Sequence, residues 1–151
     1  MRDDHDAITA LIFAYAERLD AGDLAGVADL LADATLRTDS QPGAMHGREE
    51  IYALYAGSTM LYDGRPCTRH VTTNLVIDVD AAAGTANARS YFTVFQARPE
   101  LPLQPIIAGR YQDRFSKRGA LWSFAERVIF IELVGDLRFH LKPEILAFLS
   151  P

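Results

Sequence analysis

Apolar residues recur with helical spacing over the first part of the chain. One stripe of the segment 7–20 carries the large apolar side chains Ile8, Leu11, Ile12, Tyr15 and Leu19. Charged residues lie off this stripe, so the segment is predicted to form an amphipathic helix. Gly22 can end that helix, and Asp23 can cap a second one with its own inward-facing leucines. A third helix is predicted after Gly47, because two glutamates follow in what would be its first turn.

From about residue 67 the pattern changes from helical to extended. Four long strands are predicted near residues 67–79, 85–98, 105–117 and 121–134, separated by turns that contain glycine or proline. Consecutive long strands with short connections indicate an antiparallel, strongly bent sheet. Because the helices come first and the strands follow as a meander, the predicted fold class is α+β rather than a βαβ repeat.

The last predicted strand, LWSFAERVIFIELV, has apolar residues on both of its faces. The helices can cover one face, and a second copy of the chain is the simplest cover for the other. We therefore predict a homodimer formed through the sheet. The following stretch, 135–151, is amphipathic, and Pro143 suits the first turn of a short helix. This tail either folds as a lid over the open end of the sheet or is frayed.

Length and composition fit one domain that spans residues 1–151. The chain is 49% hydrophobic and carries a net charge of −5, with its basic residues scattered. Nucleic-acid binding is therefore not expected. No apolar run approaches the length of a membrane span, and the N-terminus lacks the pattern of a signal peptide. Because Cys67 is the only cysteine, no internal disulfide can form, and we predict a cytoplasmic protein.

Two polar residues fifty positions apart are the strongest candidates for chemistry. Asp20 falls at the end of the first predicted helix, beside its buried stripe, and His70 falls at the start of the first long strand. A carboxylate that orients an imidazole gives a general base without a metal or cofactor. The alternative for Asp20 is a structural role, in which its carboxylate hydrogen-bonds the next turn at the helix end. His70 shares its face with polar residues, so it points to solvent or to the polar end of a cavity, unless a bulge changes the register.

Other candidates come from buried polar groups. Arg127 lies on an apolar face of the last strand, so it needs Asp113, Asp20 or an anionic ligand group as a partner. Near a substrate, its charge could stabilise a leaving group or a developing oxyanion. Most aromatic residues are expected in the core, but Tyr15, Tyr55 and Trp122 are the ones that we assign to substrate binding. No metal is expected, because the histidines are isolated in sequence and Cys67 has no partner cysteine.

Four segments carry a family resemblance: AITALIFAYAERLDAGDLAGVADLLADATL, GREEI, TRHVTTNLVID and GRYQDRFSKRGALWSFAERV. Together they resemble the SnoaL-like branch of the nuclear transport factor 2-like superfamily over residues 7–134. The resemblance implies a cone-shaped α+β barrel, with three N-terminal helices packed in a strongly bent antiparallel sheet. Members of this group include dehydratases, dehydrohalogenases, isomerases, polyketide cyclases and non-catalytic small subunits of ring-hydroxylating dioxygenases.

Within this group, the site pattern is most similar to the scytalone dehydratases and hexachlorocyclohexane dehydrochlorinases. These enzymes use an Asp–His dyad, and Asp20 and His70 occupy the matching places. Arg127 matches an arginine that lines the dehydrochlorinase site. Tyr15 departs from the pattern, because the dehydrochlorinase has a lysine or other polar residue there. The resemblance therefore implies the base more firmly than the leaving group or the substrate.

Three functional hypotheses follow. The first is a cofactor-independent lyase or isomerase, in which His70 removes a proton from a small, mostly apolar, cyclic or aromatic substrate. The second is a non-catalytic ligand-binding or assembly subunit, like the small subunit of ring-hydroxylating dioxygenases. The third is an isomerase with a carboxylate base inside the cone, for which Asp113 is the candidate. The distance between Asp20 and His70 separates the first hypothesis from the second.

Overall fold

The computed structural model describes residues 3–149. Its first three helices are α1 (Asp4–Ala21), α2 (Leu24–Leu30) and α3 (Gly47–Ser58). The side chain of Asp3 accepts a hydrogen bond from the Asp6 N–H at the start of α1, and the left-handed Gly22 ends that helix. The Asp23 side chain caps α2 in the same way. These local signals confirm the three helices that the apolar spacing predicts.

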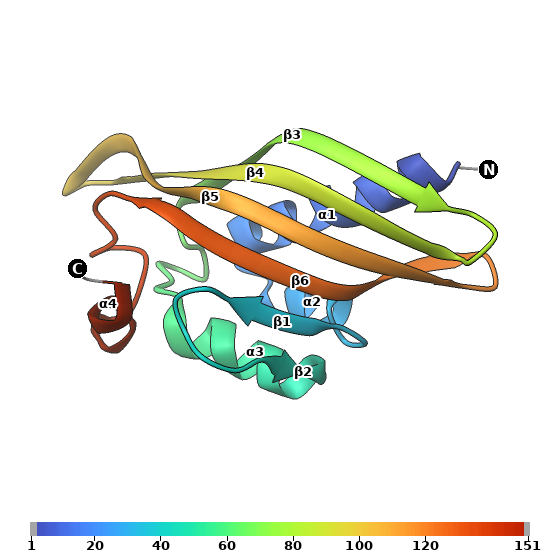
Figure 1. Cartoon of the computed structure of the whole chain (residues 1–151). Helices are drawn as coiled ribbons and strands as arrows, with labels where there is room; N and C mark the ends of the chain where they lie inside the picture. Colours follow the sequence, from blue (N-terminus) through green and yellow to red (C-terminus); the bar gives the residue numbers. More distant parts are fainter. Residues whose placement is uncertain (1–2, 150–151) are drawn as a thin grey trace.

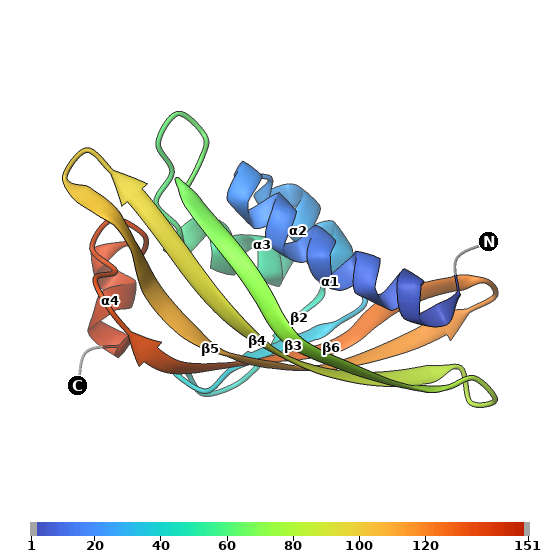
Figure 2. The ribbon, with the colours of Figure 1, turned by 90° about the horizontal axis from the view of Figure 1, so that it is seen from above.

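One curved sheet holds all the strands. They are β1 (Thr35–Thr38), β2 (Met45–His46), β3 (Thr68–Asp80), β4 (Thr85–Arg98), β5 (Leu101–Arg118) and β6 (Leu121–Val134), in the spatial order β2-β1-β6-β5-β4-β3. The four long strands form the predicted antiparallel meander, whereas β1 pairs with β6 in parallel. Figures 1 and 2 show α1, α2 and α3 on the concave face of the sheet. The α+β cone is thus confirmed.

Two irregularities reverse which side chains face the helices. In β3 the register shifts between Thr73 and Val76, and Asn74 adopts a left-handed φ of 54°. Even-numbered residues face inward before this bulge and odd-numbered residues after it. A second shift lies beside β6, between Arg114 and Phe115 of β5. The bulge expected as one explanation for a polar-faced His70 is therefore present, and it turns His70 inward.

The irregularity beside β6 also changes which residues of this strand lie on the outer face of the sheet. Before it, Trp122 and Phe124 face the core, and after it Arg127, Ile129 and Ile131 do so. The core-facing side of β6 therefore takes residues from both of the faces that strict alternation predicts. The outer face carries ion pairs as well as apolar groups, including Arg110 with Glu132.

Strand β5 begins at Leu101, four residues before its predicted start, and runs through Pro102 and Pro105. Proline is tolerated there because this end of β5 pairs with β4 alone: pairing with β6 begins only at Ile107.

The tail after β6 packs against the end of α3. Leu137 is 3% exposed, and a bridge joins Thr59 to Leu141. Helix α4 (Pro143–Leu149) begins at Pro143, as predicted. Figure 2 shows this helix at the end of the sheet opposite the start of α1. The described part of the tail, up to residue 149, is therefore folded against the domain.

Candidate active site

Asp20 and His70 meet inside the cone. Asp20 is the penultimate residue of α1, and His70 is the third residue of β3, the strand against which α1 packs. The His70 Nδ1 lies 2.6 Å from Asp20 Oδ1. The carboxylate also accepts hydrogen bonds from the His70 backbone N–H at 2.9 Å and from the Thr68 hydroxyl at 2.9 Å. Both residues are thereby fixed relative to each other.

Electrostatics keep the Asp20 carboxylate ionised. Burial alone would raise the pKa of Asp20, but the hydrogen bonds and charge of His70, together with the Thr68 hydroxyl, outweigh it and lower that pKa. An ionised carboxylate on Nδ1 makes this nitrogen the proton carrier of the neutral ring. The Nε2 nitrogen then keeps its lone pair and can accept a proton.

The imidazole of His70 lines a cavity of about 140 Å³ between the helices, the sheet and the tail. Its walls are mainly apolar and include Leu19, Phe92, Val94, Ile107, Ile129, Ile131 and Leu141. Among the described residues, no aspartate, glutamate, lysine or arginine lines the cavity, and Asp20 contacts the His70 ring without lining the cavity. The cavity therefore suits an uncharged, mostly apolar molecule.

Three tyrosines, Tyr15, Tyr55 and Tyr111, line the same cavity, and the first two are hydrogen-bonded to each other. Tyr15 from α1 and Tyr55 from α3 share a hydrogen bond of 2.5 Å between their hydroxyl oxygens. Burial raises the pKa of Tyr15 and raises that of Tyr55 further, so both stay protonated. Since one of the two protons is used between them, the other remains for donation to a ligand oxygen.

Arg127 is paired in the core and does not line the cavity. Its Nε and Nη2 donate to the two carboxylate oxygens of Asp113 at 2.8 Å each, and neither side chain is exposed. The guanidinium also lies over the rings of Tyr15 and Tyr111, at 4.2 and 3.9 Å from their centroids. Arg127 therefore packs against the rings of these two tyrosines. The same pairing ties up Asp113, so Asp113 is not a free carboxylate base as the third hypothesis requires.

Trp122 lies outside this cavity. Its indole N–H donates to the carboxylate of Asp4 at 2.8 Å, and Lys117 pairs with the same carboxylate. Of the sequence-predicted site residues, the structure thus brings Asp20, His70, Tyr15 and Tyr55 together, whereas Trp122 and Arg127 contact other groups.

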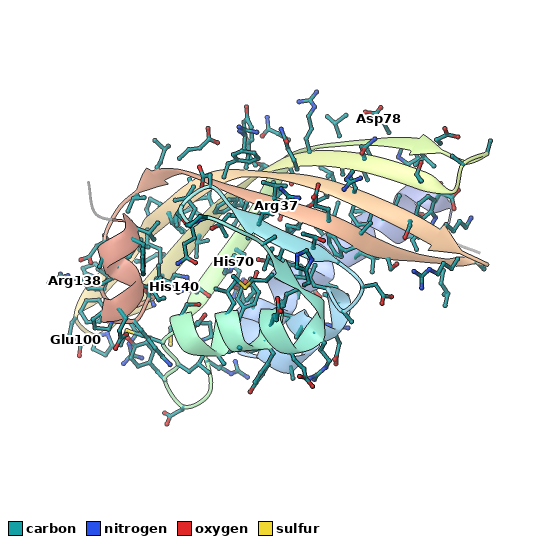
Figure 3. All side chains as sticks on the ribbon, turned by 60° about the horizontal axis from the view of Figure 1, so that its bottom comes forward. Arg37, His70, Asp78, Glu100, Arg138 and His140 are labelled. Atoms are coloured by element: carbon teal, nitrogen blue, oxygen red, sulfur yellow. The ribbon has the colours of Figure 1, made fainter. Side chains whose placement is uncertain are left out.

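His140 is a cavity residue that the sequence reasoning missed. It comes from the tail, and its ring centroid lies 6.5 Å from that of His70 (Figure 3). Burial and the nearby His70 lower the pKa of His140 to about 4. The signal in the sequence was a histidine between two apolar residues, FHL, but only the position of the tail brings it to the cavity.

The helix-lined cone that holds this pair is also the fold of a solved NTF2-like protein. The model of the family described as "SnoaL-like domain" matches residues 1–128. The chain belongs to this SnoaL-like family. No curated protein matches the sequence.

Solved structures with the same fold include three proteins from Novosphingobium aromaticivorans. An NTF2-like protein with a cystatin-like fold is 22% identical over 98% of this chain and 90% of that chain, with a TM-score of 0.70. A putative scytalone dehydratase is 23% identical over 88% and 87%, with a TM-score of 0.70. The β subunit of a putative aromatic-ring-hydroxylating dioxygenase is 20% identical over 89% and 93%, with a TM-score of 0.67. At these identities the likeness concerns the fold alone.

Within residues 3–149, the side chains show no metal site and the helices show no membrane span. No group of three or more histidine, cysteine, aspartate or glutamate side chains in this range is placed to hold a metal ion. None of the helices in the same range combines the length and the apolar character that a membrane crossing needs.

Proposed function

We propose that this protein is a cofactor-independent lyase or isomerase that acts on a small, mostly apolar, cyclic substrate. The observation that carries the proposal is the 2.6 Å contact between Asp20 and His70, at an apolar cavity that the imidazole lines. A partly buried carboxylate that fixes one ring nitrogen leaves the other as a general base.

The chemistry would begin with proton transfer from carbon. The substrate C–H bond breaks, the proton goes to Nε2 of His70, and the electron pair remains on the substrate as an enolate or an equivalent carbanion. Asp20 stabilises the imidazolium that forms. The tyrosine O–H that is not used between Tyr15 and Tyr55 donates a hydrogen bond to the substrate oxygen.

The second step decides between the two reaction types. In a lyase, the imidazolium of His70 returns its proton to a departing hydroxyl, and water leaves as the new double bond forms. In an isomerase, it returns the proton to a different carbon atom. Both endings restore the neutral ring, so neither needs a metal or an external oxidant.

Hydrogen–deuterium exchange into a ketone tests the first step without knowledge of the natural substrate. We expect the wild-type protein to accelerate exchange of the α-protons of cyclohexanone in D₂O, followed by proton NMR. His70→Ala and Asp20→Asn should each lower that acceleration by about 10²–10⁴-fold. His5→Ala and Asp33→Asn, at exposed positions, are the matched controls. Equal exchange rates in the dyad variants and in the wild type, with the fold intact, would refute the proposal.

A non-catalytic ligand-binding or assembly subunit is the second candidate. The mixed outer face of the sheet favours it, because exposed Tyr91, Val71 and Val76 lie there beside charged residues. The same face is the surface through which we propose a homodimer. Sedimentation equilibrium gives the self-association. A larger partner that copurifies, combined with no exchange activity, would favour the assembly role.

A further inference from the structure

The described tail is fixed firmly at His140, on both sides of the residue. The carbonyl of Phe139 accepts hydrogen bonds from the Tyr62 hydroxyl at 2.8 Å and from Gln96 Nε2 at 2.9 Å. Gln96 is fully buried. The carbonyl of His140 itself accepts from the Met60 N–H at 2.8 Å. Three donors from other segments therefore set the position of this one side chain.

The ring of His140 is half-buried and has unused hydrogen-bonding capacity. Its Nδ1 is inaccessible to solvent and has no hydrogen-bond partner. A ligand in the cavity cannot reach that nitrogen, so only the other ring nitrogen, Nε2, is available for a hydrogen bond there. The ring lines the cavity beside His70, and its lowered pKa keeps it neutral, with one donor and one acceptor nitrogen.

The cavity itself limits what can be bound. An engineered apolar cavity of about 150 Å³ accommodates benzene, and the present cavity of about 140 Å³ is of the same size. A molecule that lies wholly within this volume is therefore about the size of one six-membered ring. Since no ionised carboxylate, ammonium or guanidinium lines it, a charged ligand would lose its hydration without gaining a partner.

We propose that His140 is a substrate-binding residue that hydrogen-bonds the carbonyl or hydroxyl group of an uncharged, single-ring substrate. This inference deepens the proposed function and rests on the same cavity. His140 acts as the polar contact contributed by the tail, while His70 faces the reacting carbon. The two imidazoles then have separate tasks: one binds an oxygen, and the other moves a proton.

Ligand binding tests this role apart from turnover. Three probes of similar size are compared by NMR titration: cyclohexanone, methylcyclohexane and cyclohexanecarboxylate. In the wild type we expect cyclohexanone to bind most tightly and the carboxylate most weakly. His140→Phe keeps a ring in the tail but removes the hydrogen bond, so it should weaken cyclohexanone binding by about tenfold and leave methylcyclohexane binding unchanged. His140→Asn, which can still hydrogen-bond, should recover part of the loss.

His5→Phe, at an exposed position of α1, is the matched control for the change of residue type. A thermal melt of each variant ensures that only folded proteins are compared. Wild-type affinity for cyclohexanone in His140→Phe would overturn the inference, and so would a wild-type preference for the carboxylate or no cyclohexanone binding at all. The proposed function fails separately: unchanged deuterium exchange in His70→Ala refutes the base, whatever His140 does to affinity.

Discussion

Two acid–base pairs lie inside the same cone, and they differ in whether a hydrogen-bonding atom of the pair remains available at the cavity. Arg127 and Asp113 form a two-point ion pair with no exposure, and aromatic rings cover the guanidinium. Asp20 and His70 form a one-point pair, in which the second ring nitrogen is left over at a cavity. The pair with two charge-to-charge contacts and no exposure serves the fold, although one buried guanidinium nitrogen, Nη1, has no hydrogen-bond partner. The pair with a spare lone pair at an apolar cavity is the one to which we assign the proposed chemistry.

The largest effect on stability is expected at the sealed pair. Arg127→Met leaves the Asp113 carboxylate buried without its partner, which should lower the free energy of unfolding by about 3–5 kcal/mol. Urea denaturation followed by circular dichroism measures it. The double variant Arg127→Met with Asp113→Leu should recover much of the loss, because no buried charge is stranded.

Arg114→Met is the control for this comparison, since Arg114 lies on the same sheet but is well exposed in its pair with Glu126. Its cost should stay within about 1 kcal/mol. If Arg127→Met costs no more than Arg114→Met, the sealed pair is not the structural element described above.

A smaller effect on stability is expected at the cavity pair. Asp20→Asn keeps the size of the side chain but removes the charge that His70 and Thr68 contact. The free energy of unfolding should fall by about 1–3 kcal/mol, the range for hydrogen bonds to a charged group. The same denaturation experiment measures it. A loss as large as that of Arg127→Met would mean that the dyad is mainly structural.

A further effect is a change in how stability depends on pH. The folded pKa of His140 is lowered to about 4 from an ordinary value near 6.5, so between these pH values the unfolded chain binds a proton that the folded chain excludes. Stability contributed by the neutral ring is therefore present above about pH 6.5 and is lost as the pH falls toward 4. The Asp20 contribution is lost at lower pH, because its pKa lies below the usual value of 3.8.

Thermal melts between pH 4 and 7 test this difference. The melting temperature of the wild type should drop more steeply across the window than that of His140→Phe, which has no group to titrate at that position. His70 and Asp20 are present in both proteins, so the difference between the two curves reports the change at position 140. Parallel curves for the two proteins would contradict the neutral state of His140.

The sequence predicted much of this arrangement, because its signals are local. Helical spacing, the glycine turn at Gly22 and the alternation of β4 each depend on neighbours in the chain. The juxtaposition of Asp20 and His70 came from their places in family motifs. Strict alternation failed beyond the bulge at Asn74, since one extra residue reverses the faces of a strand.

What the sequence could not supply depends on distant segments. Arg127 was correctly expected inside, but only the structure chooses Asp113 from its possible partners. Trp122 also faces inward, but its indole N–H donates a hydrogen bond to Asp4, away from the cavity. His140 reaches the cavity because Gln96 and Tyr62 hold the tail, and neither contact has a signature in the sequence.

The most direct test of the central claim is the protonation of the His70 ring, measured by ¹⁵N NMR of the histidine side chains in the neutral state. The contact with Asp20 predicts that Nδ1 carries the proton and that Nε2 is unprotonated. Asp20→Asn should reduce the population of that tautomer, while His5→Ala should leave the His70 signals unchanged. A neutral His70 with its proton on Nε2 in the wild type would contradict the account, because the nitrogen facing the substrate would then have no lone pair with which to accept a proton.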